Sequence, residues 1–360
     1  MNLLTKPDFA RTLERFEAWW DCQIIDRPPV TVQAKSKAKV NLPTKQHASL
    51  RERWLDMEYA VDRFEADLSS REYLADTVPI FFPNIGPEAC GTLFGCELEF
   101  GDYTSWSKPV FTSCRQVPGT RPNFENPYWS ALRRGTDISL HRSAGRWLTA
   151  MADLHTGGDL LASLRDPQEL CMELIDDSQA VSQACRYVTE FFPAIFEDLW
   201  NRIAAHNLPC TSWAPSLHMG KGMILQCDLI CMISPQMFRE IILPALEAET
   251  RYLQRSFFHL DGPGALRHLD DLLSMEKLNG VQWVYGEGQG TAKDWIDVYR
   301  RIQQAGKCMQ IICRDFDDAL IIARNIRPAG AWLCIGKPYS PDDIQAFCKT
   351  MEQWAAGKKV

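Results

Sequence analysis

Short apolar runs alternate with helical patterns along most of this chain. Eight of these runs have the length of a strand, and they cover residues 30–34, 77–82, 147–152, 210–214, 255–260, 279–284, 307–313 and 329–335. Buried strands that alternate with helices form parallel sheets. Eight such strands predict a (β/α)8 TIM barrel, and a doubly wound sheet is the alternative fold.

The segment before the first expected strand has its own helical pattern. Apolar residues recur at helical spacing from Phe9 to Trp20, and Arg27-Pro28-Pro29 ends the pattern. We expect residues 1–25 to supply an N-terminal helix that packs on the barrel. No repeat or clear linker divides the rest of the chain, so residues 1–360 are expected to form a single domain.

Composition narrows the class of partner. The chain has 360 residues, of which 24% are charged, and its net charge is −7 without a basic block. Nucleic acid is therefore not expected as a partner, because phosphate binding needs clustered positive charge. No apolar run approaches the roughly 20 residues of a membrane span. Because the first residues lack an apolar signal core and the thirteen cysteines suit reduced, buried thiols, we expect a cytoplasmic protein.

Chemistry-bearing residues follow the run at 255–260. His259 and Asp261 stand two apart where this strand should end, before Gly262-Pro263-Gly264. Residues two apart on an extended segment point the same way, so both side chains can enter one pocket. We expect them to be catalytic, with His259 as general acid or base and Asp261 orienting it. A divalent metal at His259 and Asp261 is a second possibility, and a hydrogen-bonded pair that closes the barrel top is a third.

Other polar and aromatic residues lie near the ends of the expected strands or on long connections between them. They form a mixed set that suits a small polar ligand held against aromatic walls. The residues expected to bind substrate are Asn84, His155, Trp213, Gln226, Asp228, Gln282, Trp283 and Lys337. For Trp283, a place in the core is the alternative.

Several stretches resemble the uroporphyrinogen decarboxylase superfamily, which includes corrinoid-linked methyltransferases. Asp26–Val30 and Ile80–Ile85 look like its first two strands, and Gln226-Cys227-Asp228 followed by Ile233–Phe238 resembles its central signature. His259–Gly264 is similar to a decarboxylase-like subgroup often labelled as trimethylamine corrinoid protein. The resemblance implies a (β/α)8 barrel.

Departures from the family pattern narrow the expected activity. The arginine run with which the decarboxylases hold substrate carboxylates is replaced at residues 32–37 by a stretch with lysines, and their aspartate and histidine are replaced by Asn84 and Lys337. These changes argue against porphyrin decarboxylation. The zinc methyltransferases use a His-x-Cys pair and a distant Cys, where this chain has His259-Leu260-Asp261 and Lys337. A thiolate-rich zinc site is therefore not expected.

The resemblance leaves three functions open. The leading one is a methyltransferase-type barrel enzyme that acts on a small polar methylated or carboxylated substrate, with a corrinoid on a partner protein as methyl carrier. The second is a lyase or decarboxylase that acts on a substrate other than a porphyrin. The third is a non-catalytic binding or accessory protein. Relatives often pair through their barrel faces, so a homodimer is a possible assembly.

Overall fold

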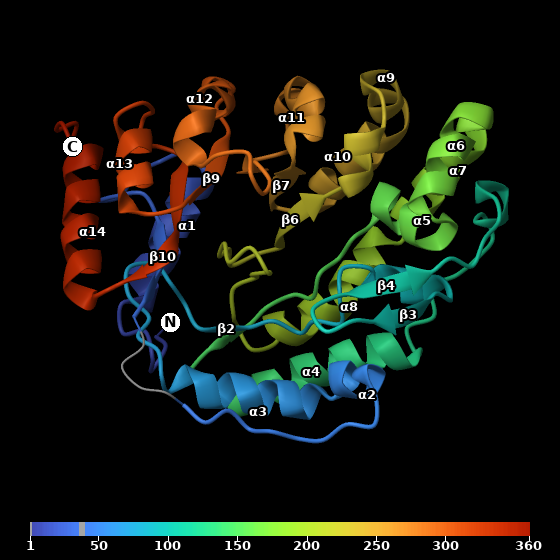
Figure 1. Cartoon of the computed structure of the whole chain (residues 1–360), viewed down its shortest axis with the longest axis horizontal. Helices are drawn as coiled ribbons and strands as arrows, with labels where there is room; N and C mark the ends of the chain where they lie inside the picture. The colour runs from blue at the N-terminus through green and yellow to red at the C-terminus, as the bar shows by residue number, and fades with distance from the viewer. Residues whose placement is uncertain (1, 36–39) are drawn as a thin grey trace.

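Six parallel strands form the main sheet of the protein. The computed structural model describes residues 2–35 and 40–360, so part of the lysine-containing stretch 32–37 lies outside the described residues. The sheet has the order β1-β10-β9-β8-β7-β6 and curls into half of a barrel (Figure 1). Its strands are β1 (Val30–Ala34), β6 (Gly222–Gln226), β7 (Arg255–Asp261), β8 (Gly280–Val284), β9 (Cys308–Cys313) and β10 (Ala331–Tyr339).

Helices alternate with these strands and cover the outer face of the sheet (Figure 1). The helices of this half are α9 (Pro235–Met237), α10 (Leu243–Tyr252), α11 (Leu269–Ser274), α12 (Ile296–Gln304), α13 (Phe316–Ala323) and α14 (Pro341–Ala355). Side-chain caps start three of them, and Ser234 accepts from the Met237 backbone at α9. Asp315 accepts from the Asp318 backbone at α13, and Ser340 accepts from the Asp343 backbone at α14, with Pro341 in the first turn.

The first half of the chain contributes mostly helices. Two short parallel strands, β2 (Ile80–Phe81) and β5 (Leu148–Thr149), pair with each other, and β3 (Glu97–Phe100) and β4 (Ser105–Lys108) form an antiparallel hairpin. The helices are α1 (Phe9–Trp20), α2 (Leu50–Leu55), α3 (Met57–Leu68), α4 (Pro127–Ser143), α5 (Gly157–Arg165), α6 (Pro167–Asp176), α7 (Ser178–Thr189) and α8 (Phe192–Ala204). Among the described residues, no helix is both long and apolar enough to cross a membrane.

The expected ring of eight strands is present only in part. Single hydrogen bonds, not ladders, link the β2–β5 pair to its surroundings. The Asp76 N–H donates to the Val30 carbonyl at 2.8 Å beside β1, and the Met151 N–H donates to the Thr211 carbonyl at 2.8 Å beyond β5.

The prediction of a strand at 210–214 is wrong. Cys210 makes one isolated bridge with His218, and Pro209 and Pro215 flank a segment that runs no further along a sheet. The strand that pairs with β7 is β6, whose five residues are all buried. Gln226 therefore lies at the end of a strand rather than on a long connection.

Helix α1 packs on the end of the sheet opposite the strands' carboxyl ends. Trp19 is fully buried, its ring meets Phe257 at 5.6 Å and Trp332 at 5.4 Å between ring centroids, and its indole N–H donates to the Met309 carbonyl at 3.2 Å. Phe257 precedes His259 by two residues on β7. The aromatic contacts of α1 thus support the strand that carries the site.

Replacing Trp19 with Ala should lower the free energy of unfolding by about 3–5 kcal/mol, because a large cavity and a lost indole hydrogen bond remain. Urea denaturation measures the change. Leu4→Ala is the matched control, since Leu4 is 77% exposed and its loss should cost less than about 0.5 kcal/mol. Equal effects of the two substitutions would contradict the role of α1.

Candidate functional site

One row of polar side chains crosses the concave face of the sheet. Gln226 pairs in register with His259, His259 with Gln282, and Gln282 with Gln310. Side chains at the same register of neighbouring strands lie on the same face. We call these four residues the polar row. The three amides are almost completely buried, so each must find its hydrogen-bond partners inside the protein.

Hydrogen bonds run along the polar row in one direction. His259 Nδ1 bonds to Gln282 Oε1, and Gln282 Nε2 donates to Gln310 Oε1. Gln310 Nε2 then donates to Cys334 Sγ at 3.0 Å. An amide oxygen can only accept, so Nδ1 of His259 carries a proton, and in the neutral ring the lone pair is then on Nε2.

Cys334 anchors the far end of the row on the neighbouring strands. Its Sγ also accepts from Thr31 Oγ1 at 3.2 Å, and the Trp332 indole, which can only donate, bonds to Thr31 Oγ1 at 3.1 Å. Burial raises the pKa of Cys334 to about 12, so it remains a thiol. The polar row thus ends on a neutral thiol that accepts hydrogen bonds from Gln310 and Thr31.

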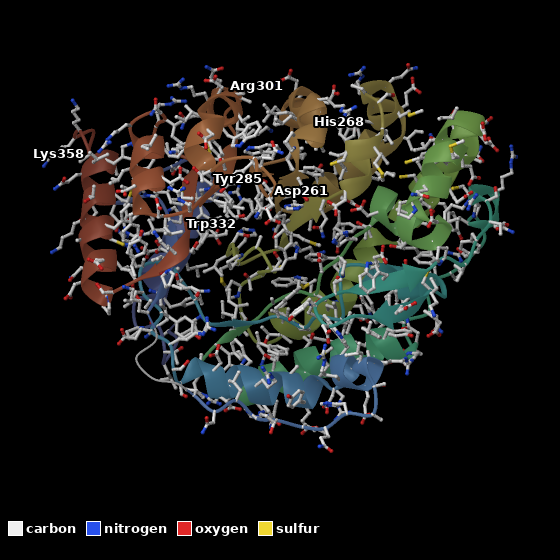
Figure 2. All side chains as sticks on the ribbon, viewed as in Figure 1. Asp261, His268, Tyr285, Arg301, Trp332 and Lys358 are labelled. Atoms are coloured by element: carbon white, nitrogen blue, oxygen red, sulfur yellow. The ribbon has the colours of Figure 1, made fainter. Side chains whose placement is uncertain are left out.

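Asp228, His259 and Asp261 form the acidic cluster at the carboxyl ends of the strands. One ligating atom from each side chain lies within 4.8 Å of the other two. Asp261 ends β7 and lies toward the middle of the molecule, whereas Arg301 lies near the molecular edge (Figure 2). One imidazole nitrogen and two carboxylates suit a divalent cation of hard or borderline character.

A buried Asp–His–Asp triad supports the acidic cluster. His155 Nε2 lies 3.2 Å from Asp153 Oδ2, and His155 Nδ1 lies 3.2 Å from Asp159 Oδ2. Burial lowers the pKa of His155, but the two carboxylates outweigh it and raise that pKa well above the usual value. The two carboxylates therefore favour the imidazolium form of His155. His155, Asp159 and Asp228 also lie close enough together to share a cation, but His155 would have to release a proton before it could bind one.

Asp159 fixes the backbone that carries Asp228. Its carboxylate accepts from the Asp228 N–H at 3.0 Å and the Leu229 N–H at 3.2 Å. Burial alone would raise the pKa of Asp159, but His155 and these two N–H groups lower it. Partial loss of water and the Asp159 charge raise the pKa of Asp228. The site therefore holds more negative charge than His155 balances.

Trp213 forms an aromatic wall beside His259. The two rings meet edge to face, with centroids 5.1 Å apart and an interplanar angle of 86°. The buried indole N–H of Trp213 has no hydrogen-bond partner among the residues that the structure describes. Gln226 completes this side of the site by donating to Asp153 Oδ1.

Three residues expected to bind substrate lie apart from the acidic cluster. Trp283 follows Gln282 on β8 and faces the other side of the sheet, where it is fully buried and packs on Trp295 at 5.1 Å. It is a core residue. Lys337 is exposed, with Nζ 3.8 Å from Asp315. Asn84 lines a groove beside α3.

Several residues of the site were missed by sequence reasoning. Gln310 interrupts the apolar run Met309–Cys313, and a lone amide inside a buried strand is the signal that points to it. Asp159 stands four residues after His155, on the first turn of α5. That spacing is also available to any helix-surface pair, so it carries little information by itself.

Comparisons with known proteins show similarity at the level of the fold. Neither family models nor curated proteins match the chain. Among solved structures, a methyltransferase from Methanosarcina mazei is similar, with a TM-score of 0.61 over 95% of this chain and 98% of that chain. The two sequences are 12% identical, so the likeness shows a shared fold.

Glu249 lies buried beneath the triad. It is 2% exposed, and the Thr156 hydroxyl at the start of α5 donates to its Oε1. Burial raises the pKa of Glu249 to about 7, the Thr156 bond opposes this, and the Asp159 charge adds to it. The carboxyl group is thus protonated in the folded protein at pH values where it is ionised in the unfolded chain.

The raised pKa of Glu249 makes stability depend on pH. Below pH 4.5 the Glu249 carboxyl is protonated in both the folded and the unfolded chain, and the free energy of unfolding is highest. As the pH rises from 4.5 towards 7, only the unfolded chain releases this proton, so the free energy of unfolding falls by about 1.4 kcal/mol per pH unit. Glu249→Gln keeps the acceptor for Thr156 and should remove this slope. Urea denaturation at several pH values measures it, with the partly exposed Glu247→Gln as control. A slope unchanged in Glu249→Gln would show that Glu249 does not titrate in this range.

Proposed function

We propose that the chain is a methyltransferase-like enzyme whose reaction takes place at the acidic cluster. The observation that carries the proposal is the convergence of Asp228, His259 and Asp261 beside Trp213. The fold shared with a methyltransferase supports it. The substrate is a small polar molecule with a methylated nitrogen or oxygen, and a corrinoid on a partner protein accepts the methyl group. In this proposal, β2 and β5 complete a (β/α)8 barrel.

The acidic cluster fits a divalent cation better than it fits a thiolate zinc site. No cysteine belongs to the cluster among the described residues, and Lys337, at the position of the family's distant cysteine, pairs instead with Asp315. Asp228 supplies the third ligand. Because Gln282 Oε1 accepts a hydrogen bond from Nδ1–H of His259, Nε2 is available to a cation. Metal-binding histidines typically have such a hydrogen-bond partner on the other ring nitrogen.

The charges around the site favour a cation. Asp153 and Asp159 contact His155, and Asp228 lies between them and the His259–Asp261 pair. Loss of water, and then the charges of Asp159 and Asp261, raise the pKa of Asp228. A bound divalent ion would act as a Lewis acid on the heteroatom that leaves the methyl group. Trp213 forms one wall beside His259, and Gln226 holds Asp153 against His155.

The same geometry also serves His259 as a general acid or base. With Nδ1 held by Gln282, Nε2 is the atom that would take up a proton and pass it to the heteroatom that leaves the methyl group. Asp261 would then orient the substrate or the imidazole. The two roles of His259 differ in their response to removal of the cation, since only the metal-dependent role is lost.

Metal binding tests the cluster directly. Chelator-treated protein titrated with Co²⁺ should bind one ion per chain, followed by calorimetry and by visible absorbance. Asp261→Ala and His259→Ala should each weaken binding by about 100-fold, because one of three protein ligands is lost. Asp270→Ala is the control, since Asp270 is exposed and pairs with Arg301 at the surface. Wild-type affinity in all three variants would place the ion elsewhere.

Methyl transfer tests the activity itself. Methylated amines and methyl ethers are offered with cob(I)alamin as acceptor, and formation of methylcobalamin is followed by absorbance. His259→Ala and Asp261→Ala should lose turnover by about 100-fold or more while the unfolding transition is unchanged. Release of carbon dioxide without methyl transfer would favour the lyase. Wild-type turnover in both variants would contradict the proposed site.

A further inference from the structure

A second cavity lies outside the acidic cluster, along α3. This groove has a volume of about 610 Å³, within the range of small-molecule sites. We call it the α3 groove. The lining residues that matter here are Arg53, Trp54, Tyr59, Arg63, Phe82 and Asn84.

The α3 groove is joined to the site already described. A neighbouring cavity of about 430 Å³ shares Phe64, Ile80 and Phe82 with it and extends to Trp213. Trp213 in turn meets the ring of His259. A ligand in the groove could therefore extend toward the acidic cluster.

Arg63 gives the groove an unbalanced positive charge. It is half-buried, and among the described residues its guanidinium donates only to the Pro43 carbonyl at 3.4 Å and the Tyr59 hydroxyl at 3.3 Å. In the described ranges 2–35 and 40–360, every other buried or half-buried arginine has a carboxylate within 4.0 Å. A half-buried charge without a counter-ion indicates a missing anion.

Arg53 adds to this charge. The distance from Arg53 Nη1 to Asp102 Oδ1 is 3.8 Å, and the Asp102 side chain is 71% exposed. Asp102 therefore neutralises the charge of Arg53 only weakly. Asp102 is also the acidic residue that lines the groove. The groove therefore differs in sign from the acidic cluster.

Aromatic side chains form the walls of the groove. The Trp54 indole is fixed by its hydrogen bond to the Gly101 carbonyl at 2.8 Å and by stacking on Phe100. Tyr59 lies against the Arg63 guanidinium, 5.6 Å from ring centroid to Cζ. Fixed aromatic walls favour a flat ring, and the planar guanidinium matches a carboxylate in a two-bond fork.

We infer that the α3 groove binds an aromatic carboxylate, with the carboxylate on Arg63 and the ring between the aromatic walls. This inference rests on the proposed function in one respect. It takes the aromatic acid to be part of the substrate, and the methylated heteroatom of that substrate points past Trp213 towards the acidic cluster. An acid at one end and a methylated heteroatom at the other match the opposite charges of the α3 groove and the acidic cluster.

Binding of 4-methoxybenzoate, measured by calorimetry on the full chain, tests the inference. The uncharged 4-methoxybenzamide should bind at least 30-fold more weakly, and so should cyclohexanecarboxylate, which lacks the aromatic ring. Arg63→Met should weaken 4-methoxybenzoate binding by about 30-fold, and Arg63→Lys should restore part of it. Asp102→Asn should strengthen binding, because it removes the one negative charge of the groove.

Arg134→Met is the matched control, since Arg134 is an exposed arginine of α4 that pairs with Glu58 outside the groove. Thermal unfolding followed by circular dichroism shows that each variant is folded. No binding at millimolar ligand, equal affinity for acid and amide, or equal affinity in Arg63→Met and Arg134→Met overturns the inference.

Failure of the groove and failure of the proposed reaction give different results. His259→Ala and Asp261→Ala should keep 4-methoxybenzoate affinity within about 3-fold, because the groove contains neither residue. A protein that binds the acid but transfers no methyl group would refute the reaction alone. A protein that methylates cob(I)alamin from a simple amine but does not bind the acid would refute the groove alone.

Discussion

The parallel register of β6, β7, β8 and β9 is the constraint on which the site depends. It places Gln226, His259, Gln282 and Gln310 side by side on the concave face, where burial forces their polar groups to bond to one another or to neighbouring side chains. A one-residue slip of any strand would turn its member of the row to the helical face. The ladder thus sets the tautomer of the neutral His259 ring, and with it the nitrogen that remains available to a ligand.

The charge of the site depends on a second arrangement, in which a buried imidazolium holds two carboxylates. His155 binds Asp153 on one side and Asp159 on the other, and Asp159 fixes the backbone of Asp228. The triad keeps negative charge near the strand ends at a cost in desolvation that only close pairing offsets. The α3 groove carries the opposite sign, so a ligand that extends from this groove past Trp213 to the acidic cluster would have chemically different ends.

Sequence predicted the alternation of strands and helices in the second half, because apolar runs and cap residues are local signals. It failed at 210–214, where an apolar run between prolines looks like a strand but makes one isolated bridge rather than a ladder, and the strand is 222–226 instead. His259 and Asp261 could be paired from their spacing. The side of the sheet that Trp283 faces follows only from the strand register. Gln310 matters because of its bond to Gln282 on another strand, and Arg63 matters because no carboxylate among the described residues neutralises it.

The most direct test of this account is the tautomer of His259. Two-dimensional ¹H–¹⁵N NMR of protein with ¹⁵N-labelled histidine, at a pH where its imidazole is neutral, distinguishes a protonated ring nitrogen from an unprotonated one, and His259→Gln assigns the signals. The account predicts a neutral ring with the proton on Nδ1 and none on Nε2, and loss of that preference in Gln282→Leu. A proton on Nε2 in the wild-type protein would contradict the account, because the lone pair would then face Gln282 and not the acidic cluster.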